Sequence, residues 1–125
     1  MQHYRTIVLG ASNKPERYAW KAAKRLQDAS VEVIAIGNKK GSCAGVPIQK
    51  SLENPTDIHS ITLYLNPKNQ EAYYNFILRC QPQRVIFNPG TENPALYQLL
   101  KKELPNCQIE IACTLVMLSL NNFKN

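Results

Sequence analysis

Short apolar runs alternate along the chain with segments in which apolar residues recur every three or four positions. Runs rich in Ile, Val and Leu predict strands that helices cover on both faces, and the recurring pattern predicts those helices. Strands are expected at residues 6–9, 31–36, 61–65, 84–87 and 108–112. This alternation is typical of a parallel α/β sheet.

Amphipathic helices are expected between these strands, and the small side chains of the first allow close approach to the sheet. Its apolar face consists of Ala19, Ala22, Ala23 and Leu26. Later helices are expected at residues 67–79, 95–103 and 115–120. Because crossovers between parallel strands are right-handed, these elements predict a Rossmann-like three-layer sandwich with a five-stranded parallel sheet in the order 3-2-1-4-5. A length of 125 residues suits a single domain over residues 1–125.

Composition narrows the classes of partner. Hydrophobic residues make up 44% of the chain and charged residues 19%, which suits a folded globular protein. No run approaches the roughly 20 apolar residues that span a bilayer, so we expect a cytoplasmic protein without a membrane partner. The net charge of +6 favours anionic ligands. Because the basic residues are spread along the chain rather than gathered in one tract, nucleic acid is not the predicted ligand.

The loop after the first strand is the most informative segment. Gly10-Ala11-Ser12-Asn13 lies between a buried strand and a helix that starts near Arg17-Tyr18. Unpaired N–H groups and a partial positive charge at a helix N-terminus attract an anion, so the loop is a candidate phosphate site. It lacks the G-x-G-x-x-G spacing of dinucleotide enzymes, and a plain strand-to-helix turn is the alternative interpretation.

Three further loops are expected at the same edge of the sheet. Lys39 and Lys40 follow the second strand, where NAD-binding proteins carry an acidic residue, and favour a ligand with a phosphate on its adenosine ribose, such as coenzyme A or NADP. Tyr64-Leu65-Asn66-Pro67 and Asn88-Pro89-Gly90 end the third and fourth strands in restricted turns that would preform a cleft. A solvated basic turn and ordinary turn punctuation are the alternatives for each loop taken singly.

Taken together, these loops resemble those of the small stand-alone coenzyme A-binding proteins, relatives of the coenzyme A-binding domain in the α subunit of succinyl-CoA synthetase. The resemblance covers nearly the whole chain. The matching segments are Gly10-Ala11-Ser12, Arg17-Tyr18, Lys40-Gly41, Gly45-Val46-Pro47-Ile48, Ser51-Leu52, Asn88-Pro89-Gly90 and Glu92-Asn93. The resemblance implies coenzyme A extended across the strand C-termini, with pyrophosphate near residues 11–13, the adenosine phosphate near Lys39 and Lys40, and adenine beside residues 64–67.

The predicted binding residues follow from this placement. They are Gly10, Ala11, Ser12, Asn13, Arg17, Tyr18, Lys39, Lys40, Tyr64, Leu65, Asn66, Pro67, Asn88, Pro89, Gly90, Glu92 and Asn93. No metal site is predicted, because the cysteines form no C-x-x-C pair and both histidines lie far from them in sequence. The cysteines, all expected to be structural thiols, are Cys43, Cys80, Cys107 and Cys113.

No set of residues predicts catalysis. Ser12 is not in a G-x-S-x-G turn, and His59 lies in a polar segment and is expected at the surface. The phosphohistidine of the synthetase belongs to a different domain. We therefore expect non-catalytic binding of coenzyme A or an acyl-CoA, with a protein partner or a homodimer left open. The other open alternatives are an NADP-binding reductase module, one subunit of an acyl-CoA ligase, and a protein-interaction scaffold that uses the basic helix at residues 21–25.

Overall fold

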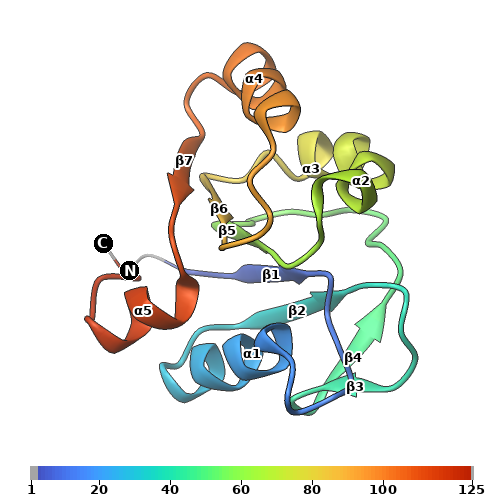
Figure 1. Ribbon diagram of the computed structural model, residues 1–125, viewed down its shortest axis with the longest axis vertical. Coiled ribbons are helices and arrows are strands. Elements are labelled where there is room, and N and C mark those ends of the chain that lie inside the picture. The colour runs from blue at the N-terminus through green and yellow to red at the C-terminus, as the bar shows by residue number, and fades with distance from the viewer. Residues whose placement is uncertain (1–2, 125) are drawn as a thin grey trace.

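The computed structural model describes residues 3–124, and within them one sheet of seven strands lies between helices (Figure 1). The strands are β1 (Thr6–Leu9), β2 (Val33–Ile36), β3 (Ser42–Cys43), β4 (Val46–Gln49), β5 (Ser60–Leu63), β6 (Arg84–Phe87) and β7 (Gln108–Ile111). The helices are α1 (Tyr18–Asp28), α2 (Pro67–Gln70), the 3₁₀ turn η1 (Glu71–Tyr73), α3 (Tyr74–Cys80), α4 (Pro94–Glu103) and α5 (Thr114–Ser119). Among the described residues, no helix has the length and apolar character needed to cross a membrane.

The sheet confirms the predicted α/β Rossmann-like class but not its strand count or order. The order is β3-β4-β2-β1-β5-β6-β7, and only the pairing of β3 with β4 is antiparallel. The prediction of five strands in the order 3-2-1-4-5 was therefore wrong. The third predicted strand, β5, pairs with β1 rather than lying beyond β2.

One overlooked strand accounts for the wrong order. β4 takes the place beside β2 that the prediction gave to residues 61–65. It contains Pro47 and alternates half-buried with exposed residues, so it has no continuous apolar run. A turn through Ala44 and Gly45, both with positive φ, joins it to β3. With β4 included, the parallel strands run β4-β2-β1-β5-β6-β7, the usual order of a doubly wound sheet.

The helices cover both faces of the sheet. Figure 1 shows α1 and α5 on one side and α2, α3 and α4 on the other. On the α1 side, Ala19, Ala23 and Leu26 pack against Val8 and Ala35. On the opposite side, residues from α3 and α4 pack against the alternate side chains of β1, β5 and β6. The first predicted helix face is thus buried as expected.

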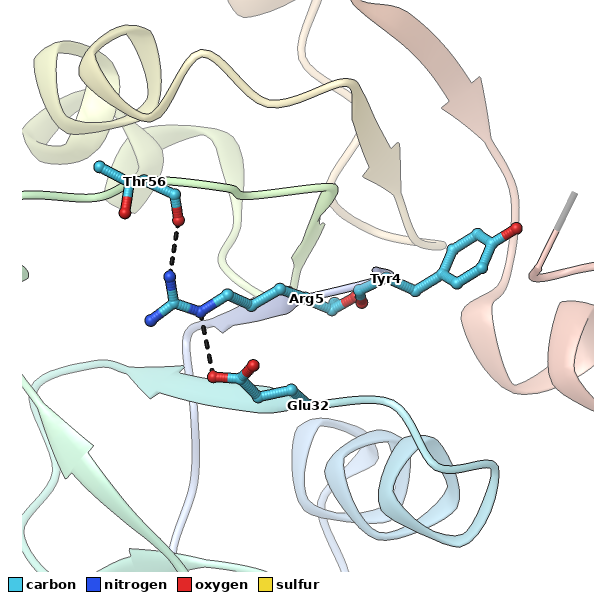
Figure 2. Close-up of polar contacts among 5 residues, drawn as sticks. Tyr4, Arg5, Glu32 and Thr56 are labelled. Carbon is cyan, nitrogen blue, oxygen red and sulfur yellow. Dashed lines mark hydrogen bonds and ion pairs between the residues drawn. The ribbon is translucent and has the colours of Figure 1, made fainter. Parts of the chain in front are cut away.

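The crossover from β4 to β5, residues 50–59, contains no helix. Arg5, which precedes β1, holds this segment through a hydrogen bond. The Arg5 Nη1 donates to the Thr56 carbonyl oxygen at 2.6 Å, and its Nε donates to Glu32 Oε2 at 3.0 Å. Figure 2 shows the Arg5 side chain between these two partners, while the Tyr4 ring points the other way. Because Glu32 precedes β2, Arg5 ties two crossovers together at the amino ends of the strands.

His59 is buried, contrary to its expected surface position. Its ring lies 4.7 Å from the ring of Tyr4, and its Nδ1 is 2.7 Å from Ser60 Oγ. The buried guanidinium of Arg84 donates from Nε to the same Ser60 hydroxyl at 2.8 Å. Burial, and secondly the charge of Arg84, lower the pKa of His59. The folded chain therefore favours a neutral imidazole at this position.

We expect the stability of the protein to fall as the pH drops below neutrality. An unfolded chain takes up a proton at His59 near pH 6.5, whereas the folded chain takes it up only at a lower pH, so folding is fully favoured above this window and weakened through it. Urea unfolding between pH 7 and pH 5 measures the slope. His59→Gln should flatten the slope, while His3→Gln at the exposed histidine should not. An unchanged slope in His59→Gln would contradict this explanation.

Candidate functional site

The carboxyl ends of the central strands lie level with one another. Leu9 pairs in register with Ile36 and with Leu63, and Leu63 pairs with Phe87. The loops that follow these strands therefore meet at one edge of the sheet, where they surround a cleft of about 730 Å³. Its lining residues are Gly10, Ala11, Ser12, Asn13, Lys14, Arg17, Tyr18, Ala19, Asn38, Lys39, Tyr64, Leu65, Asn66, Asn69, Pro89, Gly90 and Thr91.

The loop after β1 packs tightly between the residues that end β2 and those that follow β5. The N–H groups of Gly10 and Ala11 both donate to the carbonyl oxygen of Ile36, at 2.8 and 3.0 Å. Gly10 has φ +96°, and a Cβ there would lie 2.9 Å from the carbonyl carbon of Tyr64. A Cβ at Gly37 would lie 3.0 Å from the backbone nitrogen of Ala11. Glycine is favoured at both positions, because a Cβ at Gly10 would force the backbone of Tyr64 to shift and one at Gly37 would press against the loop after β1.

Cys43, on β3, supports this loop from below. Its thiol donates to the carbonyl oxygen of Ala19 at 3.7 Å. Burial raises the pKa of the Cys43 thiol, so the group stays protonated at neutral pH. The thiol thus packs beneath the loop, which agrees with the structural role predicted for it.

The N-terminus of α1 faces the cleft without a cap. Arg17 occupies the N-cap position and makes no capping hydrogen bond with its side chain, and the first turn carries no acidic residue. Arg17, Tyr18 and Ala19 all line the cleft. The first N–H groups of the helix, which have no partner inside it, therefore leave a partial positive charge at this wall.

Basic side chains add to this positive charge. Lys14, Arg17 and Lys39 line the cleft, and none of its lining residues, all within residues 3–124, is Asp or Glu. The Asn13 Nδ2 donates to the carbonyl oxygen of Lys40 at 2.8 Å, which holds the first loop against the second. The cleft therefore suits an anion with more than one charged group.

Tyr64 forms a neutral wall of the cleft. Its ring is largely buried, and burial raises the pKa of its hydroxyl to about 12. The nearby hydroxyls of Thr62 and Thr114, which are hydrogen-bonded to each other at 2.8 Å, lower this pKa by less than burial raises it. Beyond it, Asn66 caps α2, where its Oδ1 accepts from the N–H of Asn69 at 2.9 Å. These contacts position an apolar ring and two amides at the end of β5.

Five predicted binding residues lie outside the cleft lining, and most of them support it. Asn88 is buried, and its Nδ2 donates to Thr62 Oγ1 at 2.7 Å and to the Leu63 carbonyl at 2.9 Å. Its Oδ1 accepts from the N–H of Thr114 at 2.8 Å. Asn88 therefore joins β5, β6 and the start of α5. The other four are Lys40, Pro67, Glu92 and Asn93.

Asn93 and Glu92 stabilise the turn itself. The Asn93 Oδ1 accepts from two N–H groups at the start of α4, and its Nδ2 donates to Gln70 Oε1 at 2.9 Å. Glu92 Oε1 accepts from the N–H of Gly90 at 2.8 Å. Pro67 is the first residue of α2, and Lys40 contributes its carbonyl to the loop contact described above. Their side chains are positioned to shape the site rather than to line it.

Sequence reasoning missed five lining residues. They are Lys14, Ala19, Asn38, Asn69 and Thr91. Lys14 and Thr91 lie inside segments that had been singled out, so adjacency could have found them. Asn69 lies three positions after Asn66, one helical turn away, and helical spacing could have found it. Asn38 precedes Lys39 and Ala19 follows Tyr18, so adjacency to predicted residues could have found these two as well.

Comparisons with known proteins agree with this geometry. The sequence matches the family model described as CoA binding domain over residues 4–119. The crystal structure of an uncharacterized protein is 42% identical, with a TM-score of 0.91, and the match covers 98% of this chain and 100% of that chain. A search of curated proteins finds no significant match.

Two more distant structures share the fold. A hypothetical protein from Pyrococcus horikoshii OT3 is 25% identical, with a TM-score of 0.79 over 94% of this chain and 83% of that chain. A protein from Thermus thermophilus is 21% identical, with a TM-score of 0.79 over 96% of this chain and 91% of that chain. The match to the Thermus thermophilus protein, at 21% identity, shows a shared fold alone.

Gly10→Ala should destabilise the protein more than Gly45→Ala. Both glycines have positive φ, where an alanine costs roughly 1–2 kcal/mol, but only Gly10 has backbone within 3 Å of a new Cβ. The clash should add about 1–3 kcal/mol. Urea unfolding of the two variants measures the difference. Equal losses would show that the loop after β1 can move away without cost.

Proposed function

The chain belongs to the CoA-binding domain family, and from this premise we propose that it binds coenzyme A or an acyl-CoA without catalysing a reaction. The observation that carries the proposal is the charge of the cleft. An uncapped helix N-terminus and the side chains of Lys14, Arg17 and Lys39 converge there, and no acidic residue of the described chain lines it. Such a site suits the three phosphate groups of coenzyme A.

The proposed pose extends the ligand along the carboxyl ends of the strands. The pyrophosphate lies at residues 11–13, beside the start of α1, where N–H groups and a partial positive charge are available. The phosphate on the adenosine ribose lies near Lys39, which lines the cleft, rather than Lys40, which does not. Adenine lies beside Tyr64 and Asn66, which offer a ring and an amide.

The types of side chain in the cleft support binding rather than catalysis. Among the lining residues, all in the part of the chain that the structure describes, there is no Asp, Glu, His or Cys. Tyr64, with a pKa of about 12, keeps its proton at neutral pH and is a poor general base. The ligand would therefore be held without a carboxylate, imidazole or thiol in the lining to act as a nucleophile or general base.

Calorimetry with two ligands tests the placement of the ribose phosphate. Lys39→Glu should weaken coenzyme A binding by about tenfold, the lower end of what a charge-assisted hydrogen bond contributes. Dephospho-coenzyme A lacks the phosphate at issue, so its affinity should change much less. Lys102→Glu, on the exposed side of α4, makes the same change in net charge away from the cleft and serves as the control. Equal losses for both ligands would remove Lys39 from the phosphate site.

A thermal-shift comparison separates the proposal from its alternatives. A ligand that binds only the folded chain raises the melting temperature, so coenzyme A should do so and NADP should not. Stabilisation by NADP alone would favour a reductase module. No stabilisation by either would overturn the proposal in favour of a protein-interaction role.

A further inference from the structure

A smaller groove lies on the far side of the loop that closes the cleft. It has a volume of about 260 Å³ and lies between the start of α4 and the carboxyl ends of β6 and β7. Its apolar members are Phe87, Pro94, Tyr97 and Ile111, and its polar members are Glu92, Asn93 and Gln98. No Lys or Arg of the described chain lines it, so it differs in character from the cleft.

Ile111 is the unusual member of this groove. It is 66% exposed although it ends a strand, while its register partner Phe87 is buried. Because paired residues of neighbouring strands point to the same face of a sheet, both side chains lie on the α4 side. One exposed isoleucine needs no explanation alone. Here it forms the outer wall of a hollow whose inner wall is a buried phenylalanine.

Successive residues of a single loop line the cleft and the groove. Pro89, Gly90 and Thr91 line the cleft, and the next residues, Glu92 and Asn93, line the groove. This loop is held in place, because the Thr91 hydroxyl donates to the carbonyl of residue 88 at 2.7 Å and Glu92 accepts from Gly90. The groove therefore lies at a fixed position beside the proposed binding site.

The pantetheine arm of coenzyme A has the length to reach the groove. Neighbouring strands lie about 4.8 Å apart, so β6 and β7 lie roughly 10–14 Å across the sheet from β1. The number of covalent bonds from phosphorus to sulfur along the arm is about the number in the backbone of four amino-acid residues. Four residues extend to roughly 14 Å. With the pyrophosphate at the loop after β1, the sulfur reaches the loop at residues 89–93.

We propose that this groove receives the acyl chain of a short, uncharged acyl-CoA, an inference that rests on the proposed function. Phe87, Tyr97 and Ile111 supply the apolar surface that a hydrocarbon chain buries. The carboxylate of Glu92 lines the same groove and repels an acyl chain that ends in a carboxylate. The groove thus selects butyryl over succinyl, two acyl groups of equal carbon number.

Titration of wild-type protein with four ligands tests the selection. Each methylene that is fully buried raises affinity by about fourfold, so butyryl-CoA should bind between about fourfold and fifteenfold more tightly than acetyl-CoA. Succinyl-CoA should bind no more tightly than acetyl-CoA. If coenzyme A and all three thioesters bind equally, the acyl groove is overturned and the proposed function stands. If none of them binds, both are overturned.

Two matched variants test whether this groove causes the preference for butyryl-CoA. Ile111→Thr should reduce the butyryl preference to within about twofold while leaving the affinity for free coenzyme A unchanged. Val116→Thr changes another exposed branched residue, on α5 and outside the groove, and should keep the preference. A full butyryl preference in Ile111→Thr would overturn the proposal. A wild-type dimer seen by sedimentation, lost in Ile111→Thr and accompanied by no acyl preference, would assign the groove to a second copy instead.

Discussion

The close approach of three loops is the constraint on which the site depends. One carbonyl, that of Ile36, accepts hydrogen bonds from the N–H groups of both Gly10 and Ala11, which draws the loop after β1 against the end of β2. On the other side, the same loop touches the backbone of Tyr64 so closely that no Cβ fits at Gly10. The start of α1 is consequently held beside the ends of β2 and β5. A bulkier turn would move the helix N-terminus, and with it the positive end of the cleft, away from the other loops.

Polar side chains beneath the cleft also fix the positions of its loops. Asn88 joins β5, β6 and the start of α5 through three hydrogen bonds, and Asn93 caps α4 while contacting Gln70 of α2. A buried amide that satisfies both its donor and acceptor groups fixes the geometry of a turn more firmly than apolar packing does. Both residues lie in segments predicted from the sequence to bind the ligand. Their contacts account for the shape of the loop that follows β6.

The prediction succeeded where the pattern was local. The bounds expected for β1 and β6 agree with the structure, and the other predicted strands were found with small shifts at their ends. Twelve of the predicted binding residues line one cleft, although no bound ligand tests their roles. The prediction failed for β4, whose four residues include Pro47 and show no continuous apolar run. That strand is defined by its hydrogen bonds to β2, which no pattern within residues 46–49 encodes.

The amino-acid sequence by itself determined the α/β class, the glycine turn after β1 and the excess of positive charge, because each depends on residue type and short-range spacing. The tertiary structure decided the strand order, because β4 occupies the place beside β2 while β5 pairs with β1 on its other side. It also decided that Lys39 but not Lys40 lines the cleft and that His59 is buried against Tyr4. These outcomes depend on which distant segments pack together, and a side chain's exposure is set by those neighbours rather than by its own place in the sequence.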